Sequence, residues 1–239
     1  MASGEFPILT DTDIHVWSVA LDVSQESAGQ LLVLLSADEH VQAERLRTED
    51  LRRRFVVRRA RLRELLGRYL EDEPSALRFD RGALGKPSLA RPWSDSRLCF
   101  SASHSTDLAL VAVSLDRALG VDVERVRPMP DLETLCRNYF APSESEALRR
   151  LPESERLASF FRAWVRKEAM LKALGTGLSF GLDQVVVSLD AEIAQVIAIR
   201  GNCRSAAAWR VDDLRPHPNY AAALARPAGD CRVAFLRSP

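Results

Sequence analysis

The stretch at residues 160–177 is the feature that most constrains how this chain folds. It is rich in good helix formers and contains no proline, and glycines stand near its end, so we expect a helix that ends at Gly175. Trp164, Glu168 and Lys172 are spaced four residues apart, which places them in one row on one face of that helix. A glutamate one turn before a lysine can form a surface ion pair, or it can be half of a site for a metal ion and a phosphate.

A second stretch, residues 119–125, has the composition of a β-strand and carries two carboxylates. Asp122 and Glu124 are two residues apart, so their side chains point to the same face of the strand. Two adjacent carboxylates repel each other, and a strand tolerates them on a solvated edge or where a cation neutralises them. Together with Glu168 they would supply three oxygen ligands suited to Mg²⁺. Lys172 would then stand one helical turn from the metal, where it can meet a phosphate.

These two stretches resemble the central motifs of the 4′-phosphopantetheinyl transferases, in particular those of the larger, monomeric, surfactin-synthetase-activating class. The motifs occur in the order of the family and at roughly its spacings, and the resemblance extends from about Ser36 to the C-terminal strands. The matching segments are residues 85–87, 100–104, 120–124, 139–144 and 164–172.

The resemblance implies an α+β fold of two similar halves, which are related by a pseudo-twofold axis and hold the active site in the cleft between them. We expect an N-terminal α+β half at residues 1–117, with the contacts to the nucleotide of coenzyme A. A C-terminal half at residues 118–239 would carry the metal site and the catalytic helix. Strands are expected at residues 14–19, 98–103, 108–113, 119–124, 184–189, 194–199, 207–211, 220–225 and 231–236.

The reaction that the resemblance implies is the transfer of 4′-phosphopantetheine from coenzyme A to a serine of an acyl or peptidyl carrier protein, with release of adenosine 3′,5′-bisphosphate. Asp122, Glu124 and Glu168 would hold Mg²⁺ on the pyrophosphate. Lys172 would neutralise charge on the transferred phosphate. The serine hydroxyl needs a general base, and both Glu144 and Glu168 are candidates.

A basic region is expected to bind the 3′-phosphate of coenzyme A. Residues 40–70 are helical in pattern and rich in arginine, whose fork suits phosphate, although such a helix can also be a solvated face that pairs with acids. The family often has a basic residue near the position of Gln42, and this chain does not. Arg45, Arg47 or Arg59 could take its place, and the sequence does not choose among them.

A turn-rich loop at residues 79–87 supplies further expected contacts, because its glycines allow the backbone to approach a ligand closely. By itself Lys86 could be a surface lysine, and His104 could be structural. The resemblance implies instead that Lys86 contacts the nucleotide part and that His104, which is also counted as catalytic, contacts a phosphate. The expected coenzyme A contacts are Arg45, Arg47, Arg59, Arg81, Gly85, Lys86, Pro87, Ser103, His104, Asp122 and Lys172.

Two capping-box patterns predict where helices begin. Ser36 is followed three residues later by Glu39, and Ser143 is followed three residues later by Glu146. In the second pattern Glu144 would be an acid in the first turn, which is favourable at a helix N-terminus and is the structural alternative to its role as a base.

Composition narrows the class of protein. With 239 residues, 46% of them hydrophobic and 28% charged, the chain matches an ordinary globular protein. The formal net charge is zero, which argues against nucleic acid as the main partner. No apolar run approaches the roughly 20 residues of a membrane span, and no signal-peptide pattern opens the chain. Because the four cysteines are scattered, we expect reduced thiols, no zinc site and a cytoplasmic location. The two-half architecture that the resemblance implies predicts a monomer.

Two alternatives from other classes remain open on the sequence alone. A Mg²⁺-dependent nuclease also combines acidic residues with a lysine, although here the lysine follows the glutamate by four residues on a helix and broad basicity is missing. A non-catalytic module that binds coenzyme A or a carrier protein is the other, and the intact trio of carboxylates argues against it.

Overall fold

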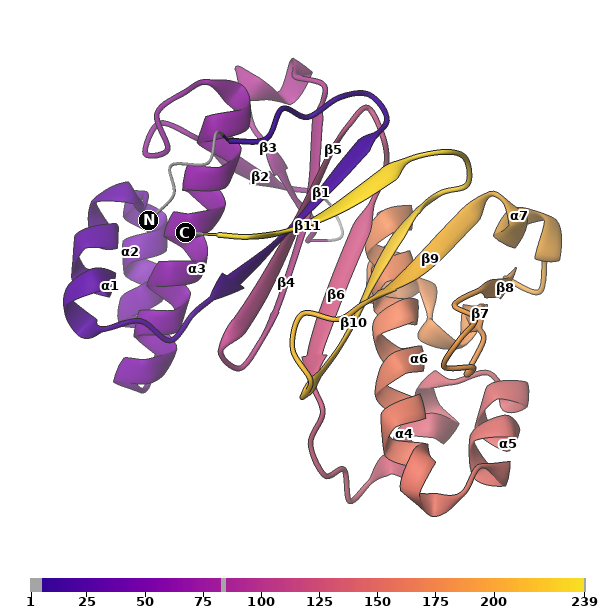
Figure 1. The fold of residues 1–239 in the computed structure, drawn as a ribbon. Coiled ribbons are helices and arrows are strands. Elements are labelled where there is room, and N and C mark those ends of the chain that lie inside the picture. Colours follow the sequence, from indigo (N-terminus) through magenta and orange to yellow (C-terminus); the bar gives the residue numbers. More distant parts are fainter. Residues whose placement is uncertain (1–5, 83–84, 239) are drawn as a thin grey trace.

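Within residues 6–82 and 85–238, which the computed structural model describes, the strands form two main sheets and two small ones (Figure 1). The strands are β1 (Asp13–Ala20), β2 (Phe79–Arg81), β3 (Pro87–Leu89), β4 (Leu98–Ser105), β5 (Leu108–Leu115), β6 (Gly120–Arg125), β7 (Val185–Val187), β8 (Val196–Ile199), β9 (Trp209–Leu214), β10 (Tyr220–Pro227) and β11 (Arg232–Arg237). The first main sheet has the order β11-β1-β5-β4, and the second has the order β6-β10-β9. The pairs β2–β3 and β7–β8 form the small sheets.

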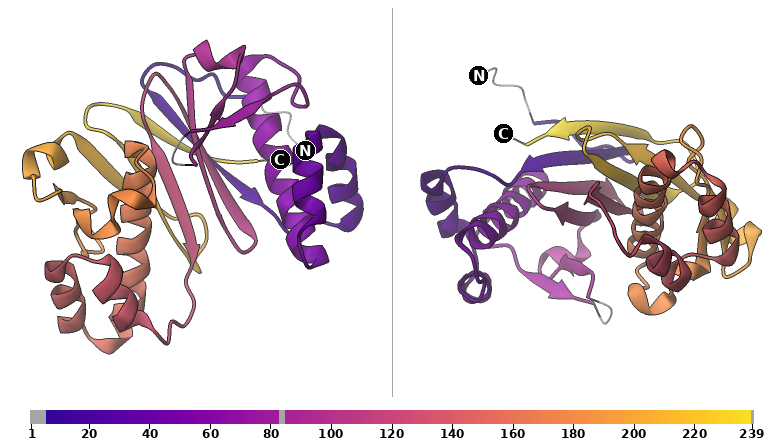
Figure 2. Two further views of the ribbon diagram at one scale, coloured as in Figure 1. Left: turned by 180° about the vertical axis from the view of Figure 1, so that it is seen from behind. Right: turned by 90° about the horizontal axis from the view of Figure 1, so that it is seen from below.

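The helices gather at the two ends of the molecule, with the main sheets between them (Figures 1 and 2). They are α1 (Gln25–Leu31), α2 (Ala37–Glu44), α3 (Glu49–Leu70), α4 (Leu132–Tyr139), α5 (Pro142–Arg150), α6 (Glu153–Leu174) and α7 (Cys203–Ala207). Short 3₁₀ helices occur at Leu32–Leu34, Trp93–Asp95, Leu178–Phe180 and Leu182–Gln184. None of the helices in the described ranges combines the length and the apolar character that crossing a membrane requires.

The two main sheets repeat one order of elements. In the first, the chain runs from β1 through α3 to β4 and β5, and β5 pairs antiparallel with β1 and with β4. In the second, it runs from β6 through α6 to β9 and β10, and β10 pairs antiparallel with both. Helices α3 and α6 each have 22 residues. The predicted α+β fold is confirmed, and this repetition is what two similar halves would produce.

The first and second sheets are also joined by the end of the chain. Strand β11 pairs in parallel with β1, so it completes the first sheet and not the second. A buried apolar cluster is shared by strands of both sheets and includes Val16, Leu110, Val121 and Leu224. The expected boundary after residue 117 falls in the connection between β5 and β6, while β11 departs from the expected C-terminal half. The division into halves at that residue therefore stays a prediction.

The ends of the two long helices follow local chemistry. Helix α6 ends before Gly175, whose φ of 68° lies in the left-handed region that glycine adopts without strain, and this confirms the predicted end. The helix predicted over residues 40–70 is instead divided into α2 and α3. Thr48 accepts a hydrogen bond from the N–H of Leu51 at 3.3 Å, and this cap starts a new helix.

The two predicted capping boxes have different outcomes. At the start of α2 the N–H of Ser36 donates to the carboxylate of Glu39 at 3.0 Å, as predicted. At the start of α5 the prediction that Glu146 closes the box is wrong. The N–H of Ala141 donates to Glu144 at 2.9 Å, because α5 begins at Pro142, two residues earlier than a cap at Ser143 would place its start.

Candidate active site

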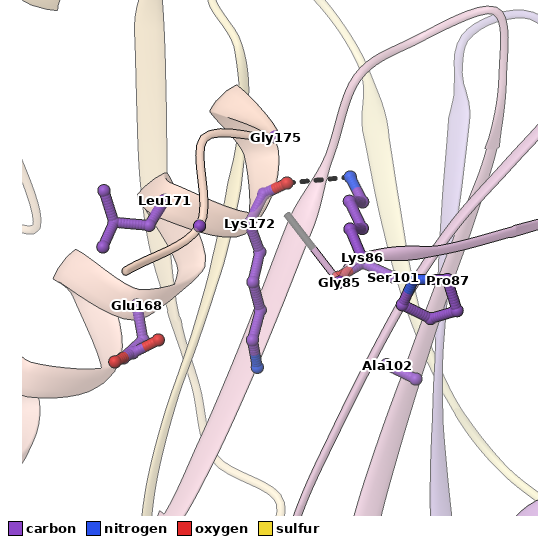
Figure 3. A pocket seen from close by; sticks show the side chains of 10 residues that line it. Gly85, Lys86, Pro87, Ser101, Ala102, Glu168, Leu171, Lys172 and Gly175 are labelled. Carbon is purple, nitrogen blue, oxygen red and sulfur yellow. Dashed lines mark hydrogen bonds between the residues drawn. The ribbon is translucent and has the colours of Figure 1, made fainter. Parts of the chain in front are cut away.

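A cleft lies where α6, β4 and the β2–β3 hairpin meet, and it consists of two adjoining hollows. The first has a volume of about 220 Å³ and is lined by Glu168 and Lys172, which extend from α6, and by Lys86 of the hairpin loop (Figure 3). The second, of about 460 Å³, reaches from Lys172 and His104 to the basic helix α3. The residues common to both hollows are Gly85, Pro87, Ala102 and Lys172.

Lys172, which lines this cleft, forms an ion pair with the buried Asp122. The Lys172 ammonium donates to Asp122 Oδ1 at 2.7 Å and to the carbonyl of Val121 at 3.1 Å. The hydroxyl of Ser103 donates to the same Asp122 oxygen at 2.7 Å. The other oxygen, Oδ2, is buried and has no hydrogen-bond partner among the described residues. Asp122 therefore holds one satisfied oxygen and one buried oxygen that lacks a donor or a cation.

The negative charge of Glu168 is poorly compensated by its surroundings in the folded protein. Burial raises the pKa of Glu168 to about 7, and the nearby negative charges of Asp122 and Glu124 add to that rise, while Lys172 opposes it. The glutamate and the two strand carboxylates therefore interact electrostatically, as their predicted association requires. A carboxyl group with this pKa is partly protonated at neutral pH, and a bound cation would favour its charged form.

These features fit a hard divalent cation only with added ligands. In the part of the chain that the structure describes, no three His, Cys, Asp or Glu side chains form a compact ligand cluster. The orphaned Oδ2 of Asp122 and the raised pKa of Glu168 nevertheless mark the place where positive charge is lacking. Magnesium takes few protein ligands and keeps waters and phosphate oxygens, so this donor set suits it. The ligand set of Asp122, Glu124 and Glu168 stays a prediction.

His104 lines the second hollow and is exposed to it. The surrounding protein lowers the pKa of His104 to about 4, chiefly by desolvation, and the positive charges of Arg58 and Lys172 lower it further. The imidazole is therefore neutral at pH 7. In this ligand-free state it can donate a hydrogen bond to a phosphate oxygen, and the negative charge of a bound phosphate would raise its pKa.

The structure distinguishes among the three arginines that the sequence left as alternative contacts to the 3′-phosphate. Arg59 lines the second hollow and pairs with Glu39, whereas Arg45 and Arg47 are exposed around the break between α2 and α3 and do not line it. Arg58 lines the hollow as well and was missed. It lies four residues before Leu62, another lining residue, so helical spacing could have indicated it. The side chain of Arg81, also an expected contact, lies outside the described residues.

Lys86 is not a free surface lysine. Its ammonium donates to the carbonyl of Leu119 at 3.1 Å and to that of Lys172 at 2.8 Å, and Figure 3 shows the second of these bonds. Burial lowers the pKa of Lys86, and the charge of Lys172 adds to the effect. The hairpin loop is thereby fastened to the end of α6 and to the start of β6. Gly85, with a φ of 84°, turns the loop beside it.

Glu144 lies away from the cleft and is enclosed. Its carboxylate pairs with Lys167 at 2.5 Å and accepts hydrogen bonds from the N–H groups of Ala141 at 2.9 Å and Val187 at 2.8 Å. Only 3% of Glu144 is exposed, so no substrate hydroxyl reaches it. This geometry argues against the predicted role of Glu144 as a general base and favours its structural alternative.

Comparison with known proteins places the chain in a family. Residues 118–225 match the family model described as the 4′-phosphopantetheinyl transferase superfamily. The 4′-phosphopantetheinyl transferase HetI of Nostoc sp. is 39% identical over 217 residues, which cover 91% of this chain and 89% of the relative. The 4′-phosphopantetheinyl transferase psf-1 of Bacillus pumilus is 32% identical over 167 residues, with 67% of this chain and 66% of the relative covered. The chain belongs to the 4′-phosphopantetheinyl transferase superfamily.

The predicted kind of enzyme, a phosphopantetheinyl transferase, is thereby confirmed. The nuclease and the non-catalytic binding module are not favoured by these relatives.

Proposed function

We propose that this chain transfers 4′-phosphopantetheine from coenzyme A to a serine of an acyl or peptidyl carrier protein and releases adenosine 3′,5′-bisphosphate. The observation that carries the proposal is Lys172, which lines the cleft together with Glu168 and forms an ion pair with Asp122, whose Oδ2 has no partner among the described residues. Such a site concentrates both signs of charge at one place, which is what the transfer of a charged phosphoryl group requires.

The pyrophosphate of coenzyme A would lie at the junction of the two hollows. Lys172 lines both, and its ammonium would shift from Asp122 toward the phosphate that is transferred. His104 would donate a hydrogen bond to a phosphate oxygen, and Arg58 and Arg59 would bind the 3′-phosphate at the far end of the second hollow.

A divalent cation has a defined place in this proposal. Asp122, Glu124 and Glu168 would hold Mg²⁺, which would withdraw negative charge from the pyrophosphate and orient it. The unpartnered oxygen of Asp122 and the raised pKa of Glu168 support this assignment.

The general base is proposed to be Glu168 rather than Glu144. As the carrier serine oxygen attacks the phosphorus that bears pantetheine, the bond to adenosine 3′,5′-bisphosphate breaks and the serine proton passes to a carboxylate oxygen. Glu168 lines the cleft and is only half-buried, so a substrate hydroxyl can reach it, whereas Glu144 is buried and satisfied.

We also propose a class within the family, an oligomeric state and a cellular location for this protein. We assign the chain to the surfactin-synthetase-activating class, because both halves and the whole cleft come from one chain, and for the same reason we propose a monomer. A cytoplasmic location fits the free thiols, including the buried Cys136.

Intact-mass analysis of an apo carrier protein tests the proposal. After incubation with this protein, coenzyme A and Mg²⁺, we expect a gain of one phosphopantetheine that is absent with EDTA and absent for a carrier in which the acceptor serine is alanine. If several acyl and peptidyl carriers show no gain while coenzyme A binds, the chain is a binding module and the proposal fails.

A further inference from the structure

Strands β4 and β6 lie side by side at the cleft but belong to different sheets. Serine hydroxyls of β4, at every second residue, link them. The hydroxyl of Ser101 accepts the N–H of Val121 at 3.1 Å, and that of Ser103 donates to Asp122. We call this row of Ser101, Ser103 and Ser105 the serine seam.

Ser105 makes two bonds across the serine seam. Its hydroxyl accepts the N–H of Arg125 at 3.1 Å and donates to Glu124 Oε2 at 2.7 Å. Because the Arg125 N–H occupies one lone pair, the hydroxyl proton is directed at Glu124. The competing partner of Glu124 is the exposed Arg127, whose guanidinium is 3.5 Å from the same oxygen. Without the serine hydroxyl, the carboxylate would be free to turn outward toward Arg127.

We propose that Ser105 is a positioning residue that aims the Glu124 carboxylate at the cation site. The inference rests on the proposed function, since it concerns the metal ligands assigned there. Ser103 does the same for Asp122, whose Oδ1 it shares with Lys172, so only Oδ2 is left for a cation. Hydrogen-bond partners of metal ligands restrict the orientations that the ligands sample, and their loss typically costs about 10–100-fold in metal affinity.

Another residue of the serine seam, Ser101, serves as the control for the test of Ser105. Ser101 is on the same face of the same strand and also bridges to β6, but its partner is the N–H of Val121 and not a carboxylate. Ser101→Ala therefore removes a bond between the two strands without releasing a metal ligand. Ser105→Thr keeps the hydroxyl and is expected to rescue the position.

The test is a Mn²⁺ titration of the full chain without coenzyme A, followed by electron paramagnetic resonance of the free ion. We expect Ser105→Ala to weaken Mn²⁺ binding about tenfold, and Ser101→Ala and Ser105→Thr to stay within about twofold of the natural protein. Thermal unfolding of the metal-free variants shows whether each has folded, and Ser105→Cys, which replaces the hydroxyl by a thiol that donates only weakly, is titrated in its place if Ser105→Ala has not.

Two results would overturn the inference in different ways. If the natural protein binds Mn²⁺ and modifies a carrier while Ser105→Ala binds as tightly, or Ser101→Ala loses as much, Ser105 does not aim Glu124. If the natural protein neither binds Mn²⁺ nor modifies any carrier, the proposed function itself fails, and the inference falls with it.

Discussion

The ammonium of Lys86 donates a hydrogen bond to the main-chain carbonyl of Lys172, 86 residues away in sequence, at 2.8 Å. With its second bond, to the carbonyl of Leu119, it ties one hairpin loop to the last turn of α6 and to β6. A side chain that was expected to meet the nucleotide thus fixes the wall of the cleft. It thereby adds a second donor to a carbonyl in the last turn of α6, which also accepts the N–H of Gly175 at 3.3 Å.

Lys86→Met should therefore act on stability as well as on binding. The substitution removes the ammonium from the Leu119 carbonyl and from the Lys172 carbonyl, which still accepts the N–H of Gly175, and we expect it to cost about 1–3 kcal/mol of unfolding free energy. Urea unfolding measures that loss, and the KM for coenzyme A should rise because the loop is no longer fastened. Ser88→Ala, an exposed change in the same hairpin, is the control. Unchanged stability with a raised KM would mean that the amine contacts the nucleotide directly.

Gly120→Ala should be strongly destabilising. A Cβ at Gly120 would lie 2.0 Å from the carbonyl oxygen of Ala169 and 2.5 Å from the nitrogen of Ala173, so β6 and α6 would have to separate. We expect a loss of about 3 kcal/mol or more, or no folded protein. Gly29→Ala is the matched control, because a Cβ there meets nothing within 4 Å and alanine favours α1. Equal melting temperatures for the two variants would contradict the close packing of β6 on α6.

The stability of the metal-free protein should depend on pH through Glu168. Its pKa rises from 4.5 in the unfolded chain to about 7 in the folded protein, so the folded state binds more protons between these values. The contribution of Glu168 to stability is therefore lost as pH rises from about 4.5 to about 7. Glu168→Gln should remove this loss and gain of order 1–2 kcal/mol at pH 8, after allowance for partial exposure, with no gain near pH 4.

Chemical unfolding of Glu168→Gln and of the natural protein at both pH values checks this. Glu133→Gln, at an exposed position of α4, should show no such difference. A Glu168→Gln variant that keeps full transfer activity would refute the proposed roles of this residue as ligand and base.

Glu144→Gln separates a structural carboxylate from a catalytic one. The substitution leaves the fully buried ammonium of Lys167 without its counter-charge, and breaking a buried ion pair in this way costs about 3–5 kcal/mol. We expect a much lower melting temperature but, for the folded fraction well below it, a kcat within about twofold of the natural protein. A fall in kcat of about a hundredfold without loss of stability would restore Glu144 as the base.

The parts of the site that the sequence could predict are those that depend on the spacing of residues within one strand or one helix. Spacing by two places Asp122 and Glu124 on one face of β6, and both indeed face the serines of β4. Spacing by four places Glu168 and Lys172 in one row of α6, and both line the cleft. Each inference needed only the geometry of a single element.

What could not be predicted depends on contacts between distant segments. The two carbonyls that hold Lys86 and the enclosure of Glu144 by Lys167 follow from packing between elements, and no spacing encodes them. The cap at Thr48 was hidden because the arginine-rich pattern continues on both sides of it. The strand expected at residues 207–211 begins only at Trp209, because the short helix α7 occupies the residues before it.

The parallel pairing of β11 with β1 also determines when the first sheet can be completed during synthesis of the chain. Asp13 of β1 and Arg232 of β11 form an ion pair, and they are separated by 219 positions. One edge of β1 therefore stays unpaired until β11 has left the ribosome, so the first sheet cannot close while the second half is still being made. Contacts between such distant residues slow folding. The nascent chain exposes an open edge of β1 throughout that interval, and such an edge can pair with a strand of another chain.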